Sequence, residues 1–394
     1  MKKYKKPSVL WVTLFPVGGA LSILRGENIL FDLFYRDEIS GYGILSSRDL
    51  RVVGNVSYFD VVCCQREGSN VSNIRDIILN DTFILDLDDL LFANACYRKD
   101  SFDAWKKNHL SETLELLLNC QKLSVTSNRL AVLLEKYTNV DCLGKSVVIP
   151  NCLVFPDSFA DRSVNKTQAL IWTSSDLAAL VKSRDDVIEA SFDFCDSKCI
   201  PIYLFGKFPN NLGINYDKIK NFGMVDFMQH KQLLHKLSGK VIAISPLETD
   251  ADLQTLDFIS GKSDLKIVEY GGYGIECVYS DSDAFAQSDL QINYMPKNKY
   301  DDWVSALNQA YENPQISEDN VSEIRFRRSV SRVSFDYWLP TFKNCIRDKI
   351  IEIASLEKLC EIQKKQPLIK KIWSYGLPKS FRRKVDPFLK PIFG

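Results

Sequence analysis

The feature that most constrains the fold is an alternation of short apolar runs with longer amphipathic segments. In the first 150 residues, strand-like runs occupy 9–15, 59–64, 82–87, 122–126 and 146–149, and helix-like segments separate most of them. Alternation of this kind is typical of a parallel sheet with helices on both faces. The first part of the chain is therefore predicted to be an α/β domain with a doubly wound sheet.

The alternation resumes after a polar, aperiodic stretch at 156–166, with strand-like runs at 168–173, 200–205, 241–244 and 275–279. A chain of 394 residues also exceeds the size of one ordinary domain. We predict domains at 1–155 and 167–335 joined by the linker 156–166, a helical region at 336–361 that returns to the first domain, and a tail at 362–394. Within the second domain we expect a helix at 176–190, a turn at 282–285 and a short strand at 290–293.

Polar residues gather where the predicted strands of the first domain end, namely Gly18, Gly19, Arg66, Asp86, Asp88 and Asp89. Ligands of parallel sheets bind beyond the carboxyl ends of the strands, so these residues are candidates for a site. The aspartates could hold a divalent metal, act as a base or bind sugar hydroxyls. Alternatively, one of them could only cap the following helix.

The second domain has its own candidate site at 261–280, where a short charged helix meets a glycine break and then a strand. Lys262 and Lys266, together with Lys207, could stabilise a leaving diphosphate, and Glu269 could accept hydrogen bonds from ribose hydroxyls. Ser174 and the two residues after it could bind a phosphate at a helix N-terminus or could form an N-cap. The alternative for 261–280 is an ordinary helix with a solvated charged face.

Charge and aromatic residues set the tail apart from the rest of the chain. The whole chain has 50 basic and 50 acidic residues, whereas 361–394 has nine lysines and arginines against Glu361 and Asp386. Trp373, Tyr375 and Phe381 lie among these cations, a combination typical of contact with an anionic membrane surface. Packing of the tail back on the body is the alternative. No nucleic-acid-binding module is recognisable, so no nucleic acid partner is expected.

The cysteines favour a reducing compartment, and the histidines give no sign of a metal site. The eleven cysteines include no CxxC pair, which fits the cytoplasm better than a disulfide framework. His109, His230 and His235 show no metal-ligand spacing and are interpreted as ordinary residues. No uninterrupted apolar run is long enough to span a membrane. The basic and apolar N-terminus is interpreted as a buried first strand rather than a signal peptide.

Several of these segments, taken in order, resemble the motifs of two-domain GT-B glycosyltransferases, close to glycosyltransferase family 4 and the O-antigen and capsule transferases. The similar segments are 12–25 with its two glycines, Phe59–Arg66, Ile84–Leu90, Ser124–Leu130, Val148–Asn151, Ile171–Ser175 and Lys262–Ser280. The last is similar to the pattern KSxxKxxEYxxxGxPVVxS. The resemblance covers about residues 8 to 345, and the shared order is more specific than any single motif.

The resemblance implies a GT-B fold, with two Rossmann-like domains facing a central cleft. A nucleotide diphosphate sugar would bind the second domain and an acceptor the first, with no obligatory metal or other cofactor. The expected donor-binding residues are Ser174, Lys207, Lys262, Lys266, Glu269 and Gly272, with Glu269 on the ribose. The expected acceptor-side residues are Gly18, Gly19, Arg25, Arg66 and Asp86, and Asp88 or Asp89 would be the base if the reaction inverts.

This sequence departs from the family pattern in two places. Gly261 stands where a second glutamate is usual, and Ile275-Glu276 replaces Gly-x-Pro. The expected function is transfer of a sugar to a lipid-linked glycan acceptor at the cytoplasmic face of the cell membrane. A non-catalytic GT-B-shaped subunit of a glycan assembly complex and a nucleotide-sugar epimerase are the alternatives. Substitution Glu269→Ala is expected to abolish nucleotide binding and leave the fold intact.

Overall fold

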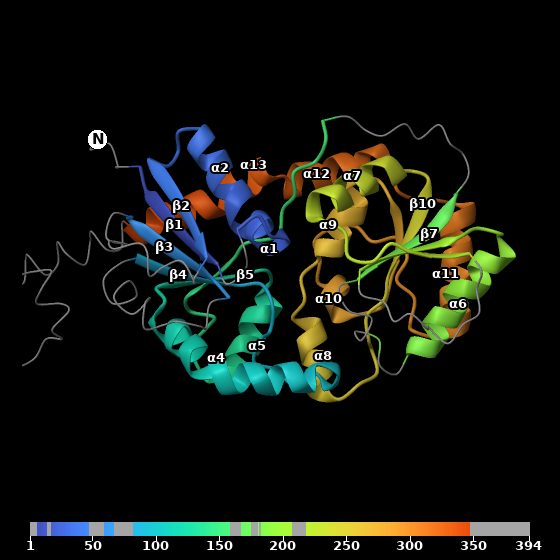
Figure 1. The fold of residues 1–394 in the computed structure, drawn as a ribbon, viewed down its shortest axis with the longest axis horizontal. Helices are drawn as coiled ribbons and strands as arrows, with labels where there is room; N and C mark the ends of the chain where they lie inside the picture. The colour runs from blue at the N-terminus through green and yellow to red at the C-terminus, as the bar shows by residue number, and fades with distance from the viewer. Residues whose placement is uncertain are drawn as a thin grey trace, which may run out of the picture.

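The fold is described from a computed structural model. The residues that it describes are 6–13, 17–46, 59–66, 82–157, 167–174, 180, 183–206 and 218–346. Figure 1 shows two α/β domains side by side, each built around one sheet. The predicted tail, most of the linker and Lys207 lie outside the described residues.

The N-terminal domain contains a six-stranded, fully parallel sheet in the order β2-β1-β3-β4-β5-β6. The strands are β1 (Ser8–Thr13), β2 (Gly41–Ser46), β3 (Val61–Gln65), β4 (Thr82–Leu87), β5 (Lys122–Val125) and β6 (Ser146–Val148). Strands β3 and β4 are buried along their whole length. Helices cover both faces of a parallel sheet, which explains why these strands are continuous apolar runs and do not alternate with polar residues.

Helices and short helical turns connect these strands. A near-continuous helical segment after β1 consists of α1 (Ala20–Ser22), the π-helix η1 (Ile23–Glu27) and α2 (Asn28–Tyr35). The turn η4 (Cys96–Arg98) leads into the long helix α4 (Lys99–Asn119) after β4, and α5 (Asn128–Thr138) follows β5. Ser127 caps α5 by accepting a hydrogen bond from the amide of Leu130, so the chain turns sharply at the carboxyl end of β5.

The C-terminal domain contains a five-stranded parallel sheet in the order β11-β10-β7-β8-β9. The strands are β7 (Ala169–Ser174), β8 (Ile202–Gly206), β9 (Ile219–Asn221), β10 (Val241–Ser245) and β11 (Glu276–Tyr279). The helices are α6 (Arg184–Ser197), α7 (Phe227–Leu237), α8 (Leu253–Ser260), α9 (Leu265–Gly272), α10 (Asp283–Ala286) and α11 (Tyr300–Glu312). Both predicted doubly wound domains are therefore present.

The chain then returns to the N-terminal domain through α12 (Glu318–Arg328), α13 (Val330–Val333) and the π-helix η6 (Ser334–Trp338). Helix α12 packs on α9, whereas α13 and η6 pack on α2, as Figure 1 shows. The indole of Trp338 meets Trp11 of β1 edge-on, with ring centroids 5.2 Å apart. The final segment thus ties the two domains together, and the boundary predicted at residue 335 falls inside η6.

Three local predictions in the C-terminal domain are wrong. The helix predicted at 176–190 begins at Arg184, because Ser183 is held by the buried carboxylate of Glu248 just before it. The strand predicted at 290–293 is not formed, and an isolated bridge joins Val278 to Tyr294 instead. The turn predicted at 282–285 is the short helix α10. In the first two cases a tertiary contact, absent from the local pattern, decides the structure.

Candidate functional site

The first group of candidate residues is a charged cluster beside the carboxyl end of β7. The carboxylate of Glu269, on α9, contacts three side chains. Its Oε2 accepts a hydrogen bond from Lys266 Nζ at 2.7 Å. Its Oε1 contacts Lys231 of α7 and lies 3.8 Å from Nδ1 of His230. Lys266 Nζ also donates to the hydroxyl of Thr173 at 2.6 Å, which joins the cluster to β7.

Burial and charge together determine how these groups ionise. Burial alone would raise the pKa of Glu269, but Lys231, Lys266 and His230 outweigh it and hold that pKa well below its usual range. Burial lowers the pKa of Lys266, but Glu269 outweighs this effect and raises it to about 12. Burial lowers the pKa of His230 to about 4. Burial lowers the pKa of Lys231 as well, and Glu269 offsets this only in part. With both lysines protonated, the cluster has two cations, one carboxylate and a neutral imidazole.

The cluster has one positive charge more than negative charge. Of its two cations, Lys266 is the one more accessible to a ligand. The side chain of Lys231 is 8% exposed, whereas that of Lys266 is 30% exposed. Glu269 is enclosed between the two ammonium groups and is 4% exposed as a residue. Removing its carboxylate would leave both cations uncompensated, so we now expect Glu269→Ala to destabilise the fold.

The remaining predicted donor residues lie in different places. Ser174 is the last residue of β7, next to Thr173. Lys262 follows α8 and lines a pocket between the domains. Gly272 ends α9, where an added Cβ would overlap the ring of Phe155, and its carbonyl accepts from Arg325 Nε at 2.8 Å. Gly272 is thus enclosed by packing in this structure, and its role at the donor stays a prediction.

A second cluster lies where β3 and β4 of the N-terminal domain end. The guanidinium of Arg66 contacts the carboxylate of Asp88 and donates to Asp89 Oδ2 at 3.2 Å. Burial opposes ionisation of Asp89, but the charges of Lys262, Arg66 and Arg98 outweigh burial and lower its pKa. A low pKa makes a carboxylate a weak proton acceptor, so this arrangement is unfavourable for Asp89 as a general base.

Two predicted acceptor-side residues are buried inside the N-terminal domain. Arg25 donates to both oxygens of Asp86, from Nη2 to Oδ1 at 2.6 Å and from Nε to Oδ2 at 3.2 Å. Arg25 also donates to the carbonyl of Ile149 at 2.9 Å, and Asp86 accepts from Ser124 at 2.7 Å. These two residues are 1% and 0% exposed. They fix the strand ends and have no surface for an acceptor, so that prediction is wrong for both.

The two predicted glycines lie in the loop before α1. Gly18 has a left-handed backbone conformation with φ of 85°, which favours glycine, and its amide donates to Glu27 Oε1 at 2.6 Å. Gly19 is the N-cap residue of α1. Gly18 and Gly19 thus lie between the end of β1 and the start of α1. Residues 14–16 lie outside the described part of the chain.

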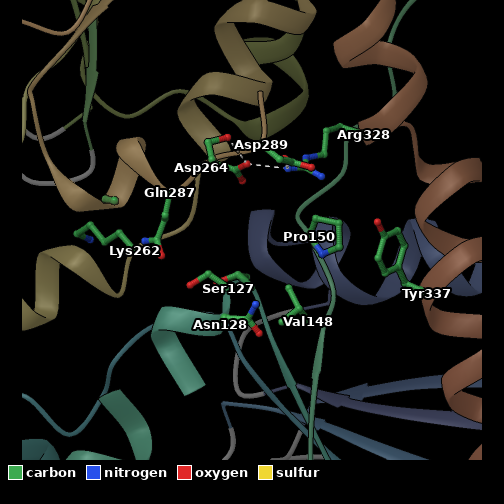
Figure 2. A pocket seen from close by; sticks show the side chains of 13 residues that line it. Ser127, Asn128, Val148, Pro150, Lys262, Asp264, Gln287, Asp289, Arg328 and Tyr337 are labelled. Carbon is green, nitrogen blue, oxygen red and sulfur yellow. Dashed lines mark hydrogen bonds and ion pairs between the residues drawn. The ribbon is translucent and has the colours of Figure 1, made fainter. Parts of the chain in front are cut away.

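A pocket of about 380 Å³ lies between the domains, and Figure 2 shows side chains from both of them around it. The N-terminal domain contributes the ends of β5 and β6, and the C-terminal domain contributes segments near α9, α10 and α12. The lining residues are Thr126, Ser127, Asn128, Val148, Pro150, Lys262, Asp264, Ala284, Gln287, Ser288, Asp289, Arg328 and Tyr337. Lys262 connects this pocket electrostatically to Asp89.

The sequence predicts Lys266 and Glu269 but not their partners His230 and Lys231, which lie 39 and 38 positions before Glu269. The histidine is interpreted as ordinary there because it shows no metal-ligand spacing. Arg328 and Tyr337 reach the pocket through the return of the chain after α12, which no local pattern encodes. Among the pocket residues, Asn128 is the one that the sequence signals, because it begins a predicted helix directly after a predicted strand.

No group of three or more His, Cys, Asp or Glu side chains in the described part of the chain is arranged to hold a metal ion. Among the helices that the structure describes, none combines the length and apolar character needed to cross a membrane.

Comparison with solved structures identifies the architecture. A glycosyltransferase from Rickettsia africae ESF-5 superimposes with a TM-score of 0.57 at 12% identity, covering 87% of this chain and 99% of that one. The lipopolysaccharide outer core galactosyltransferase WaaB gives 0.53 at 12% identity, with 87% and 99% covered. The pneumococcal O-GlcNAc transferase GtfA, solved with UDP and GlcNAc, gives 0.50 at 14% identity. The fold is GT-B.

These similarities establish architecture only, because every identity is low. The match to GtfA covers 73% of this chain, which spans 57% of the length of that protein. Neither a family model nor a curated protein sequence matches the chain. In this fold the Glu269 cluster belongs to the C-terminal domain and the Arg66 cluster to the N-terminal domain. The pocket of Figure 2 lies between the two domains.

Proposed function

We propose that this protein is a glycosyltransferase that moves a sugar from a nucleoside diphosphate sugar to a hydroxyl-bearing acceptor. The observation that carries the proposal is the excess cation at Lys266, 2.6 Å from Thr173 at the carboxyl end of β7 in a GT-B fold. Ligands of parallel sheets bind at such strand ends. A departing nucleoside diphosphate needs positive charge at this place, because negative charge develops on it as the sugar leaves.

In the proposed reaction, Lys266 stabilises the leaving diphosphate, and Lys207 and Lys262 are further candidates for the same task. Glu269 has two oxygens with about four acceptor sites, so it can accept from a ribose hydroxyl while it holds Lys266. The lysines supply the charge that a divalent metal provides in other transferases, and we propose that no metal is required. Activity that persists in EDTA would support this part of the proposal.

On the acceptor side, we propose that the Arg66 cluster orients the attacking hydroxyl. If the reaction inverts, Asp88 or Asp89 is the candidate for the base; Arg66 contacts both carboxylates. Donor hydrolysis or transfer followed by NMR of the anomeric proton would distinguish retention from inversion. The variant Asp88→Asn is expected to slow transfer and leave nucleotide binding unchanged.

The acceptor proposed here is a lipid-linked glycan of cell-surface polysaccharide synthesis, at the inner face of the membrane. The basic, aromatic segment 362–394 supports membrane contact, since cations bind anionic headgroups and aromatic rings enter the interface. Flotation of the full chain with anionic and with zwitterionic vesicles tests this. We expect binding to anionic vesicles only, and its loss when Lys370, Lys371, Arg382, Arg383 and Lys384 become glutamine. Equal flotation of both proteins would exclude the tail as the anchor.

The donor site is tested by measuring the melting temperature with UDP, GDP, dTDP and CMP. We expect at least one nucleotide to raise it in the wild type and to have no effect on Lys266→Gln. This variant should fold, because one carboxylate and one ammonium group then remain in the cluster. Lys236→Gln, on an exposed position of α7, is the matched control and should keep the response. If no nucleotide shifts the wild type, the proposal fails.

A non-catalytic subunit of a glycan assembly complex is the second candidate, and one observation favours it. At Gly261, an added Cβ would lie 3.2 Å from Leu90 Cβ and 3.5 Å from Leu130 Cδ1. A side chain at this position, where the family pattern has a glutamate, would therefore be in tight contact with the N-terminal domain. Nucleotide binding without sugar transfer or donor hydrolysis would favour this candidate.

A further inference from the structure

Helix α2 is apolar on its outer side as well as on its buried side. Ile29, Leu30 and Leu33 are buried in the core under the sheet of the N-terminal domain. By contrast, Phe31 is 61% and Tyr35 is 81% exposed, and their rings stack with centroids 6.2 Å apart. A helix at a protein surface normally has polar residues on its outer side. Because exposed apolar patches mark interaction sites, the outer side of α2 is a candidate docking surface.

A groove of about 550 Å³ lies beside this surface, between α2 and α12. Leu153 and Val330 in its lining are buried, whereas Phe31 and Val154 are exposed, and the ring of Phe155 adds further apolar surface. Figure 1 shows α2, α13 and α12 in a row along one edge of the molecule. The lining shares no residue with the pocket of Figure 2, so the groove is a separate cavity. Apolar side chains of a partner can be buried there.

We propose that this groove and the outer side of α2 bind the basic, aromatic segment 362–394 of the same chain. The described chain ends at Ile346, whose side chain packs on the core that contains Leu30 and Leu33 of α2. Lys343 Nζ donates to Glu38 Oε2 at 3.1 Å, just after the same helix. Since α13 and η6 also pack on α2, the segment would extend an interface that already exists.

The chain between the body and the aromatic residues is long enough for this contact. Residues 347–372 separate Ile346 from Trp373. These 26 residues span about 40 Å as a helix and about 85 Å when extended. A compact chain of 346 residues has a radius of gyration of about 20 Å, so the groove is within reach. Attachment to the same chain also raises the local concentration of the segment, which favours it over the tail of a second copy.

Composition and charge match the segment to the groove. The rings of Trp373 and Phe381 provide apolar surface for the apolar lining. Because 361–394 has nine basic and two acidic residues, residues 1–360 have 41 basic and 48 acidic residues, and the two parts attract each other. The groove lining contains Asp32, Asp157 and one cation, Arg325. Asp32 already pairs with an arginine of α2's own end, so exposed Asp157 is the carboxylate offered to the tail.

A segment bound here would restrict the angle between the domains, because the groove includes both places where the chain crosses between them. The amide of Leu153 donates to the carbonyl of Arg328 at 2.9 Å, and the amide of Val330 donates back to Leu153 at 3.2 Å. Arg325 Nη1 donates to the carbonyl of Pro156 at 3.1 Å. An anionic membrane competes for the same cations and rings, and so releases the segment. This release rests on the proposed membrane contact, whereas the docking itself does not.

Hydrogen–deuterium exchange of the full chain, measured by mass spectrometry over 28–35, 151–157 and 322–331, tests the docking. We expect the double variant Trp373→Ser, Phe381→Ser to exchange about tenfold faster there, because a segment docked in about nine molecules of ten slows local exchange by that factor. Ser380→Ala, in the same segment, is the control and should exchange as the wild type does. Anionic vesicles should speed exchange in the wild type, and zwitterionic vesicles should not.

On the side of the groove, Phe31→Ser should speed exchange over 322–331, which carries no substitution. Leu118→Ser is the matched control, since Leu118 is as exposed as Phe31 but lies on α4, outside the groove lining. Both variants remove an exposed side chain and should unfold close to the wild-type temperature.

Three results would overturn the docking. The first is equal exchange in the wild type and the double variant. The second is protection that grows with protein concentration, which would assign the surface to a second copy. The third is slower exchange on anionic vesicles, which would show that the membrane itself covers α2. Absence of every nucleotide response defeats the proposed sugar transfer instead and leaves the docking standing.

Discussion

At the scale of single residues, the chemistry of the C-terminal domain depends on one buried carboxylate facing two ammonium groups. Among the described residues, Glu269 is the carboxylate that pairs with both Lys231 and half-buried Lys266. We predict that Glu269→Ala lowers the free energy of unfolding by about 3–5 kcal/mol, because it leaves buried cations uncompensated. Urea unfolding of this variant beside Lys266→Gln provides the measurement.

Comparing Glu269→Ala with Lys266→Gln separates the loss of the carboxylate from the loss of one ammonium group. Lys266→Gln keeps one ammonium group opposite Glu269, so we expect it to lose about 1 kcal/mol or less. If Glu269→Ala unfolds at the same urea concentration as Lys266→Gln, the carboxylate does not stabilise the cluster, and the ribose role would become its main one.

His230 gives a prediction in pH. Its pKa is lowered to about 4 in the folded protein, chiefly by burial, against 6.5 for an unperturbed histidine. Above pH 6.5 the imidazole is neutral in both states and has no effect on stability. As the pH falls from about 6.5 to 4, the unfolded chain gains a proton that the folded protein does not, which lowers folding stability by about 3 kcal/mol.

The variant His230→Gln removes this titration. We expect the wild type to lose about 3 kcal/mol more than His230→Gln between pH 7 and pH 4, in urea unfolding at each pH. Glu269 titrates below this window in the folded protein and is present in both proteins, so it does not separate them. Parallel stability profiles would show that His230 is not buried as a neutral group.

These residues also show how far the sequence could predict the site. Lys266 and Glu269 are three positions apart on one helix, so their proximity follows from helix geometry alone. Lys231 and His230 reach the same carboxylate from α7, and that contact depends on how two helices pack on one sheet. Similarly, Asp86 and Asp88 are two positions apart on or after β4, yet one is sealed by Arg25 and the other faces Arg66. Residues two positions apart in a strand point to the same face, but β4 ends at Leu87, so only the packed structure decides which carboxylate is sealed.

At the scale of the secondary-structure element, α9 is positioned by its glycines. Gly272 lies against the ring of Phe155, and its carbonyl accepts from Arg325 of α12. We predict that Gly272→Ala costs about 1–3 kcal/mol, because the methyl group forces the ring or the helix to move. In thermal unfolding, Gly41→Ala is the control, since an added Cβ there meets nothing within 4 Å. Equal melting temperatures for the two variants would contradict this packing role.

The strands were predictable from the sequence and several connections were not. Buried parallel strands are continuous apolar runs, so β3, β4, β7 and β10 could be located without a structure. Helix α8 was missed because its turn of apolar residues is short and its start depends on Asp252, which caps it at Thr255. The bridge at Tyr294 was mistaken for a strand because one strand-like run cannot show whether a neighbouring edge is available to pair.

At the scale of the whole molecule, the two domains contact each other through α5 and α8 as well as through the return segment. The carboxylate of Asp257, on α8, accepts from the hydroxyl of Tyr137 at 2.9 Å and contacts Lys136, both on α5. Nearby, Asn151 Nδ2 donates to Ser263 Oγ at 2.8 Å across the same boundary. These polar contacts join the two domains beside the pocket of Figure 2.

If the proposed sugar transfer takes place in this cleft, substrates must enter and products must leave, so we expect these contacts to break in each cycle. We predict that Asp257→Asn favours an open arrangement, because the amide cannot balance Lys136 and the α5–α8 contact loses its charge-assisted bonds. Small-angle X-ray scattering should show a larger radius of gyration than for the wild type. Asp302→Asn, at an exposed position in the first turn of α11, should leave the radius unchanged.

Nucleotide titration gives the same prediction a second readout. If domain closure contributes to donor binding, a nucleotide should return the radius of gyration of Asp257→Asn toward that of the wild type. The apparent affinity of Asp257→Asn for the nucleotide should fall in proportion to the fraction of molecules that remain closed. An Asp257→Asn protein with the wild-type radius in the absence of nucleotide would show that the return segment α12–α13, and not the α5–α8 contact, sets the angle between the domains.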